Sequence, residues 1–302
     1  MPDTRAPAAA AVARGAFGPP ALAAPEPCVT CGEPAGTPYC PHCGERRAAD
    51  RPLRLRALAE EAWDEFAAVD GRVLRTFWTL IRRPGALTAA YVRGERLRYL
   101  TPLRLFLVVN VLYFLHVTVT GQNTFTTPLR VHLHGTPYAE LAGRVASARF
   151  AARHTTEGAY ARRFDAVAAA QAKTLVIALV PLFAGCVAGV QRGRRRPALH
   201  HAAFAFHAVS VLVLALMAVA WAAALGVAGA ERLLGPVPQP TDGQESLAIV
   251  LVFWAWLVPA VRRAYGGGWA GAAARGAALA LCVAPVLLAY RLLLFFTTFW
   301  AT

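Results

Sequence analysis

Two pairs of cysteines near the start of the chain have the spacing of a metal site. Cys28 and Cys31 form one C-x2-C-G turn, Cys40 and Cys43 form a second, and eight residues separate the pairs. Such turns can place four thiolates around one tetrahedral Zn²⁺ at about 2.3 Å, and the glycine after each pair lets backbone N–H groups point at sulfur. A complete four-sulfur shell leaves no coordination position for a substrate, so the spacing predicts a structural zinc site.

The short loop between the pairs predicts a minimal zinc ribbon with at most one small hairpin. His42 lies inside the second turn and could replace a cysteine, but four thiolates already complete the shell. A reactive redox pair is the less favoured alternative. The ribbon could also bind a protein partner or nucleic acid, and its weakly charged loop does not select between them.

A second set of polar residues lies inside long apolar runs. Arg291 interrupts the last run, and an ionisable residue inside a membrane span is by default a candidate functional group. The alternative is that its long side chain reaches the outer lipid phosphates, Glu231 or Glu245. Asn110 and His116 share the first apolar run and are expected to form hydrogen bonds between helices.

Histidines gather at the start of the third apolar run, as His200, His201 and His207. Three histidines can bind a metal or relay protons. No aspartate or glutamate accompanies them in an expected span, so aromatic and lipid-facing packing is the favoured interpretation. In the connection after the first apolar run, His132 and His134 alternate with Val131 and Leu133, and this alternation predicts an exposed strand.

The elements that position these residues follow from composition. The chain has 302 residues, of which 57% are hydrophobic and 16% charged, whereas a soluble domain has about 45–50% and about 25%. The excess predicts an all-α polytopic membrane protein, because a bilayer core needs about 20 apolar helical residues per span. We expect about five transmembrane helices, with four and six left open, over residues 103–120, 174–190, 202–230, 246–261 and 276–299.

The charges of the short connections predict the orientation. Arginines at 192–196 and at 262, 263 and 275 flank the turns after the second and fourth spans, while acidic residues dominate the turn after the third. The positive-inside rule then places the N-terminus in the cytosol and the C-terminus outside a bacterial inner membrane. The connection 121–173 disagrees, with seven basic and three acidic residues, but long connections follow the rule poorly. Its second half is expected to be helix leading into the second span, with a break at Gly158.

The residues before the first span divide into three parts. Residues 1–27 are an Ala- and Pro-rich leader expected to be disordered, 28–47 form the ribbon, and 48–102 form amphipathic surface helices that end in a basic join. The arginines of this join are expected to bind an anionic inner leaflet, because a juxtamembrane arginine gains about 1 kcal/mol there. They are Arg82, Arg83, Arg93, Arg96, Arg98 and Arg104.

The order of these features resembles a known family. The two cysteine turns precede an amphipathic helix and then Thr76-x3-Leu80, Arg83-Pro84-Gly85, Tyr91-x2-Gly94-Glu95-Arg96, Tyr99 and Pro102. This order is similar to that of bacterial multi-pass membrane proteins catalogued as domain-of-unknown-function family 3667. The start of the third run is similar to a His/Phe-rich segment there, and Glu45 stands where glutamine is commoner. The resemblance implies a zinc-ribbon head and a helical membrane body, and it brings no catalytic residues.

The sequence contains no phosphate-binding glycine loop, nucleophile elbow or zinc-protease motif. We therefore expect a non-enzymatic integral membrane scaffold or sensor with a structural zinc ribbon. A small-solute transporter or channel is the alternative, and a membrane enzyme using the histidines of the third span is a third hypothesis. The expected partners are the bilayer and a cytosolic protein; the net charge of +14 does not favour nucleic acid, because the arginines adjoin apolar runs.

Overall fold

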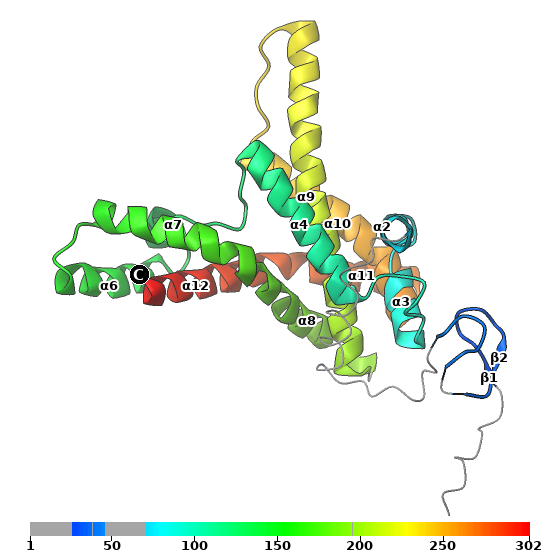
Figure 1. Ribbon diagram of the computed structural model, residues 1–302. Helices are drawn as coiled ribbons and strands as arrows, with labels where there is room; N and C mark the ends of the chain where they lie inside the picture. The colour runs from blue at the N-terminus through cyan, green and yellow to red at the C-terminus, as the bar shows by residue number, and fades with distance from the viewer. Residues whose placement is uncertain (1–25, 38, 46–70, 195) are drawn as a thin grey trace, which may run out of the picture. The chain divides into compact units, whose positions relative to one another are not determined.

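A computed structural model describes residues 26–37, 39–45, 71–194 and 196–302 (Figure 1). The chain separates into two compact units, one containing the two cysteine pairs at 28–43 and the other all the long helices that the structure describes. Each unit is considered by itself below. Most of the predicted leader, and the first half of the predicted surface helices, lie outside the described residues.

The first unit is built from two turns with matching hydrogen bonds. Strands β1 (Glu26–Pro27) and β2 (Pro34–Ala35) pair antiparallel around the first turn. The N–H of Cys28 donates to the carbonyl of Glu33 at 2.8 Å, and the N–H of Cys40 donates to that of Glu45 at 2.7 Å. One two-residue pair agrees with the expectation of at most one small hairpin, although β1 uses the last two residues of the predicted leader.

Two short helices open the second unit. Helix α2 (Arg72–Arg82) begins after Gly71 and ends before Pro84, and α3 (Ala86–Arg93) follows the turn at Gly85. Gly85 has φ +78°, and a Cβ there would lie 2.5 Å from the carbonyl oxygen of Ala260. Only glycine fits both the left-handed backbone and this close approach. The turn therefore fixes α2 and α3 against a much later helix.

Five helical segments are long and apolar enough to cross a membrane, as expected from the sequence. Three are single helices and two are broken. The single ones are α4 (Pro102–Thr120), α9 (Ala198–Leu234) and α10 (Asp242–Tyr265). The broken ones are α7 (Glu157–Leu175) with η2 (Val176–Ala178) and α8 (Leu179–Val190), and α11 (Trp269–Leu281) with α12 (Val283–Ala301). A short 3-10 turn, η3 (Arg192–Arg194), follows α8.

Prolines account for both breaks. A proline ring clashes with the carbonyl four residues earlier and cannot donate its own N–H. Pro181 therefore acts on Ile177, which lies in the 3-10 turn η2, and Pro285 acts on Leu281, the last residue of α11. Each of the two breaks therefore lies where the sequence places a proline.

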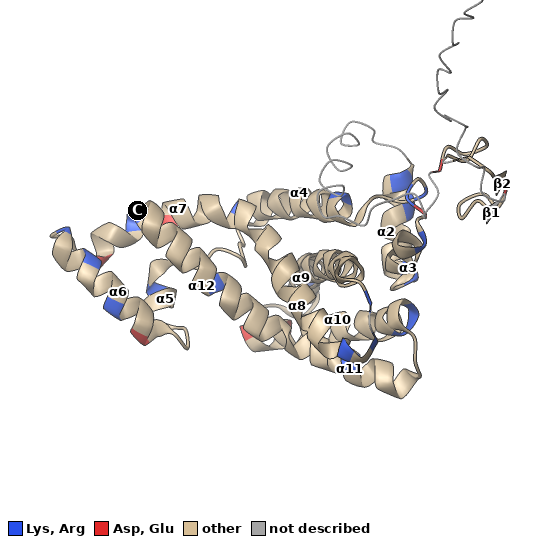
Figure 2. Cartoon of the chain, turned by 90° about the horizontal axis from the view of Figure 1, so that it is seen from below, with Lys and Arg blue, Asp and Glu red and all other residues tan. Residues whose placement is uncertain are grey.

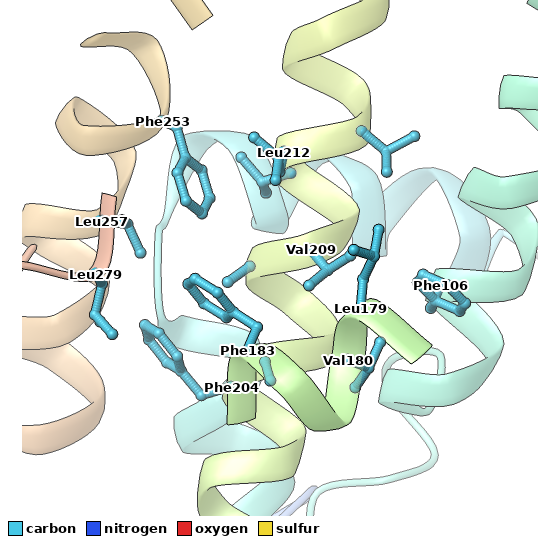
Figure 3. Close-up of a cluster of buried hydrophobic side chains, with 14 of the residues drawn as sticks. Phe106, Leu179, Val180, Phe183, Phe204, Val209, Leu212, Phe253, Leu257 and Leu279 are labelled. Carbon is cyan, nitrogen blue, oxygen red and sulfur yellow. The ribbon is translucent and has the colours of Figure 1, made fainter. Parts of the chain in front are cut away.

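The first half of α9 lies at the centre of the main core. Its Phe204, Val209 and Leu212 pack with Phe183 of α8 and Phe253 of α10, among other buried side chains (Figure 3). The second half of α9 exposes large apolar residues, including Leu225 and Leu233. Such a surface is unfavourable in water and suits contact with lipid.

The connection before α7 is helical, and the predicted strand at 131–134 is wrong. Helix α5 (Leu129–His134) starts after Pro128, and α6 (Ala139–Ala152) follows it. Leu129, His132 and Leu133 face inward with helical spacing and form a second core with residues of α7 and α12. Alternation over four residues could not distinguish this single helical face from a strand. The expected break at Gly158 lies just inside the start of α7, where Thr156 caps the helix by accepting from the N–H of Ala159.

Candidate metal centre and polar sites of the helical unit

The four cysteine sulfurs of the first unit converge on one point. Their Sγ atoms all lie within 4.8 Å of one another, with Cys28 to Cys43 and Cys31 to Cys40 both at 3.6 Å. Four sulfurs bound tetrahedrally at about 2.3 Å would be about 3.8 Å apart. All four thiols are free of disulfides. The geometry therefore fits a metal ion held by Cys28, Cys31, Cys40 and Cys43.

Electrostatics of the cluster favour a bound cation. The N–H of Cys43, directed at the Cys40 sulfur, lowers the pKa of Cys40 to about 7 despite burial. The N–H of Glu45 acts in the same direction on Cys43, yet burial and the neighbouring sulfurs raise the pKa of that thiol to about 12. One thiolate thus forms easily and a full set does not, unless a cation offsets their repulsion.

A clamp that the sequence did not indicate joins the two turns. Thr30 of the first turn donates its hydroxyl to a carboxylate oxygen of Glu45 at 2.9 Å, and the Glu45 side chain is buried. His42 is exposed and is not part of the sulfur cluster. The clamp holds the cysteine pairs in register, and the spacing of Thr30 and Glu45 alone carried no signal for it.

The arginines of the predicted basic join occupy different environments. Arg82 lies over the ring of Trp78 at 4.4 Å and Arg96 over the ring of Tyr91 at 4.6 Å, while Arg93 forms an ion pair with Glu95. Arg83 and Arg98 are exposed, and Arg98 lies 5.5 Å from the ring centre of Tyr99. Arg104 differs, because its side chain is buried within the unit. Four of the six, Arg82, Arg83, Arg93 and Arg98, are therefore exposed where a charged surface could reach them, and Arg96 is half-buried.

The three histidines of α9 are buried and contact two other helices. His207 Nδ1 lies 2.8 Å from the hydroxyl of Thr88 on α3, and His201 Nδ1 lies 3.0 Å from the hydroxyl of Tyr265 on α10. The His200 ring stacks on the same tyrosine with centroids 4.7 Å apart. Within the described residues, the cysteine cluster is the one group whose ligand atoms converge on a metal-sized site. The histidines instead join α9 to α3 and α10.

Arg291 lies at a cavity of about 500 Å³ that several helices enclose. It shares this cavity with Asp242 and Glu245 from the first turn of α10 and with His116 from α4. Glu245, one of the partners expected for Arg291, therefore faces the same space, whereas Glu231 is exposed elsewhere on α9. Asn110 does not line the cavity, and its side-chain oxygen is buried without a hydrogen-bond partner.

His116 is a cavity residue whose role the sequence did not indicate. Its side chain is 7% exposed, and its Nδ1 has no hydrogen-bond partner. Nδ1 thus does not form the hydrogen bond to another helix that was expected of His116; the ring instead packs against Tyr113 of α4 and Trp221 of α9. The connection 122–128 adds five polar residues to the lining, and α9, α10 and α12 add mainly apolar ones, including Leu212, Met217, Ile249 and Leu287.

Comparison with known proteins gives one match. Residues 70–114 match the family described as "Protein of unknown function (DUF3667)". No curated protein and no solved structure matches the chain. The DUF3667 match covers α2, α3 and the first part of α4, so it contains the Gly85 turn that contacts α10. The cysteine cluster and both cavity-lining carboxylates lie outside it.

Proposed function

We propose that the chain is a multi-pass membrane sensor whose helical unit binds a small ligand in the cavity at Arg291. The observation that carries this proposal is that one arginine, two carboxylates and a buried histidine share a space of about 500 Å³ between helices. Ligand sites in proteins are typically cavities between packed elements, in which a few convergent polar groups fix the orientation of the ligand.

The charges suit a ligand that carries both signs. Arg291 of α12 can bind a carboxylate or phosphate, while Asp242 and Glu245 can bind an ammonium group. Acidic residues in the first turn of a helix also interact favourably with the helix dipole. This interaction explains the two carboxylates even when no ligand is considered. That explanation does not extend to Arg291, which lies in the middle of an apolar helix.

Ligand binding should be visible as thermal stabilisation. Zwitterionic solutes, with leucine and γ-aminobutyrate as the first probes, should raise the unfolding temperature of the purified protein in detergent. Arg291→Gln should abolish the shift, because it replaces the charged anion-binding group by a shorter, neutral amide. Arg232→Gln is the matched control, since Arg232 is exposed and does not line the cavity. Equal shifts in wild type and Arg291→Gln would contradict the site.

A transporter of the same ligand is the second candidate, and the broken helices favour it. Transporters often form substrate sites from discontinuous spans near the bilayer midplane. The break between α11 and α12 at Cys282 immediately precedes Val283, which lines the cavity with Leu287 and Arg291. Flux of the bound solute into protein-containing liposomes that is lost in Arg291→Gln would establish transport. Binding of the solute without flux would support the sensor instead.

The cysteine cluster completes the proposal as a structural zinc ribbon. Zn²⁺ suits four thiolates in tetrahedral arrangement better than the harder divalent ions do. We place the ribbon in the cytosol of a bacterial cell and the protein in its inner membrane, as the charges of the short connections predict. The exposed arginines of the basic join would then contact anionic lipid, and the ribbon would bind a cytosolic partner. Comparing proteins that co-purify with wild type and with Cys28→Ser/Cys31→Ser tests that partner.

A further inference from the structure

A second cavity, of about 510 Å³, lies where the turn after α8 meets the turn between α10 and α11. Its polar lining is Gln191, Arg194, Arg196, Tyr265 and Arg275. The described lining residues include three arginines and no carboxylate. Figure 2 shows basic positions in blue on α10 and α11 near the turn that joins them.

Two of the guanidinium groups face the same point. A Cβ built on Gly267 would lie 2.8 Å from Nη2 of Arg194 and 3.1 Å from Nη2 of Arg275. Because Gly267 has no side chain, both guanidinium groups can approach its backbone, which brings them close to each other. Like charges placed so close repel each other strongly in a partly buried site.

Hydrogen bonds hold these side chains in place. Arg194 donates to the carbonyl of Tyr265. Arg275 donates to the carbonyls of Gly271 at 2.9 Å and Gly266 at 3.0 Å, and to Oε1 of Gln191 at 3.2 Å. The side chains are thus ordered before any ligand arrives, which lowers the entropic cost of binding.

The groups present do not satisfy the site. Gln191 is 2% exposed, and its Nε2, a hydrogen-bond donor, has no partner. The carbonyls at the end of α10 carry about half a negative charge in total, which is small against three guanidinium groups. An orphan donor beside several cations is the environment that an anion would complete.

We propose that this cavity binds a phosphate group through Arg194, Arg275 and Arg196, with Gln191 as a further donor. Guanidinium groups match the oxygens of a phosphate in fork geometry, and basic pockets between membrane helices bind anionic headgroups. The phosphate is either the headgroup of an anionic phospholipid or a free solute. The site is separate from the cavity at Arg291 and does not depend on the function proposed for it.

The test compares the unfolding temperature of the full chain in phosphatidylcholine nanodiscs with and without phosphatidylglycerol. We expect phosphatidylglycerol to stabilise wild type and to remain bound in native mass spectrometry. Arg196→Gln should reduce retention about tenfold, because it removes one charge-assisted contact to phosphate. Arg196 is exposed, so this variant should fold. The double variant Arg194→Gln/Arg275→Gln should remove the stabilisation.

Arg192→Gln is the matched control, because Arg192 lies in the same turn, is exposed and does not line the cavity. It should retain phosphatidylglycerol as wild type does. Inorganic phosphate added in neutral detergent distinguishes the sources: stabilisation by phosphate alone assigns a free solute, and stabilisation by phosphatidylglycerol alone assigns a lipid. Equal losses in Arg192→Gln and Arg196→Gln, or no stabilisation of wild type by either probe, would overturn the proposal.

Discussion

The indole Nε1 of Trp256 on α10 donates a hydrogen bond of 2.8 Å to the carbonyl oxygen of Leu80 on α2. In a continuing helix this carbonyl would accept from the N–H of residue 84, but residue 84 is proline and has none. The tryptophan therefore satisfies an acceptor that the local sequence leaves open. This bond joins the segment that matches DUF3667 to α10.

Trp256→Phe should destabilise the protein, because it keeps a large aromatic ring and removes the donor. Leu80 is 2% exposed, so its carbonyl would lose its partner in a largely buried place. An unsatisfied buried acceptor costs about 1–3 kcal/mol. The unfolding temperature in detergent should fall, whereas Trp300→Phe, at a residue 77% exposed, should have little effect. Equal stability of Trp256→Phe and wild type would show that water replaces the indole.

Gly85→Ala should destabilise more severely than Trp256→Phe. The new Cβ would lie 2.5 Å from the carbonyl oxygen of Ala260, and the left-handed backbone at φ +78° adds strain. We expect about 3 kcal/mol or more, with α2 and α3 displaced from α10. Gly226→Ala is the control, because nothing lies within 4 Å of its added Cβ and the residue is inside helix α9. That variant should be neutral or slightly more stable. A normal unfolding temperature for Gly85→Ala would mean that α3 can shift freely.

Apolar length made the helical body predictable. Runs of apolar residues predicted five spans, because apolar length is a property of neighbouring residues. The breaks in two of them lie at Pro181 and Pro285, whereas α10 contains Pro259 without a break. Span limits were less accurate: α9 extends from Ala198 to Leu234, against an expected 202–230. The residues by which α9 exceeds the expected span include ordinary helix formers such as Leu199 and Leu233. Composition alone could not assign these residues to helix or turn.

The polar sites divide in the same way. The cysteine spacing predicted four sulfurs around one point because all four lie within sixteen residues. The cavity at Arg291 draws on α4, α9, α10 and α12, so only tertiary packing brings His116 and Asp242 to it. Likewise, the sequence used Arg194 and Arg275 only to predict the orientation of the spans in the membrane. Nothing in the neighbouring sequence indicated that both side chains would face Gly267.

His132 should make stability depend on pH in the acidic range. Burial lowers the pKa of His132 from 6.5 to about 4; a hydrogen bond to the backbone of Thr127 opposes this shift, and the nearby charge of Arg291 adds to it. The folded protein thus binds fewer protons than the unfolded chain between these values. Stability is therefore complete above about pH 6.5 and is lost as pH falls toward 4, by at most roughly 3 kcal/mol.

The check is unfolding temperature against pH for wild type and His132→Gln. The variant should lose part of the acid dependence, since an amide does not titrate. His154→Asn should keep it, because His154 is exposed and asparagine tolerates its φ of +48°. An unchanged profile in His132→Gln would assign the acid sensitivity to other groups.

Metal removal should unfold the first unit and leave the second intact. The described part of the first unit has one two-residue strand pair and a cluster of thiols, so its fold depends on the ion, whereas the helical unit has its own apolar cores. Purified wild type should contain one Zn²⁺ per chain by elemental analysis, and Cys31→Ser/Cys43→Ser should contain almost none. The amount of zinc that the protein retains should also fall at acid pH, because protons compete with the metal for thiolate.

After the metal is removed by a chelator, hydrogen exchange should rise across residues 26–45, while the helical circular dichroism signal stays within a few per cent of the starting value. Cys186→Ser/Cys282→Ser, which removes two cysteines outside the cluster, should bind zinc as wild type does. Loss of helical signal together with the metal would mean that the ribbon stabilises the membrane body as well as itself.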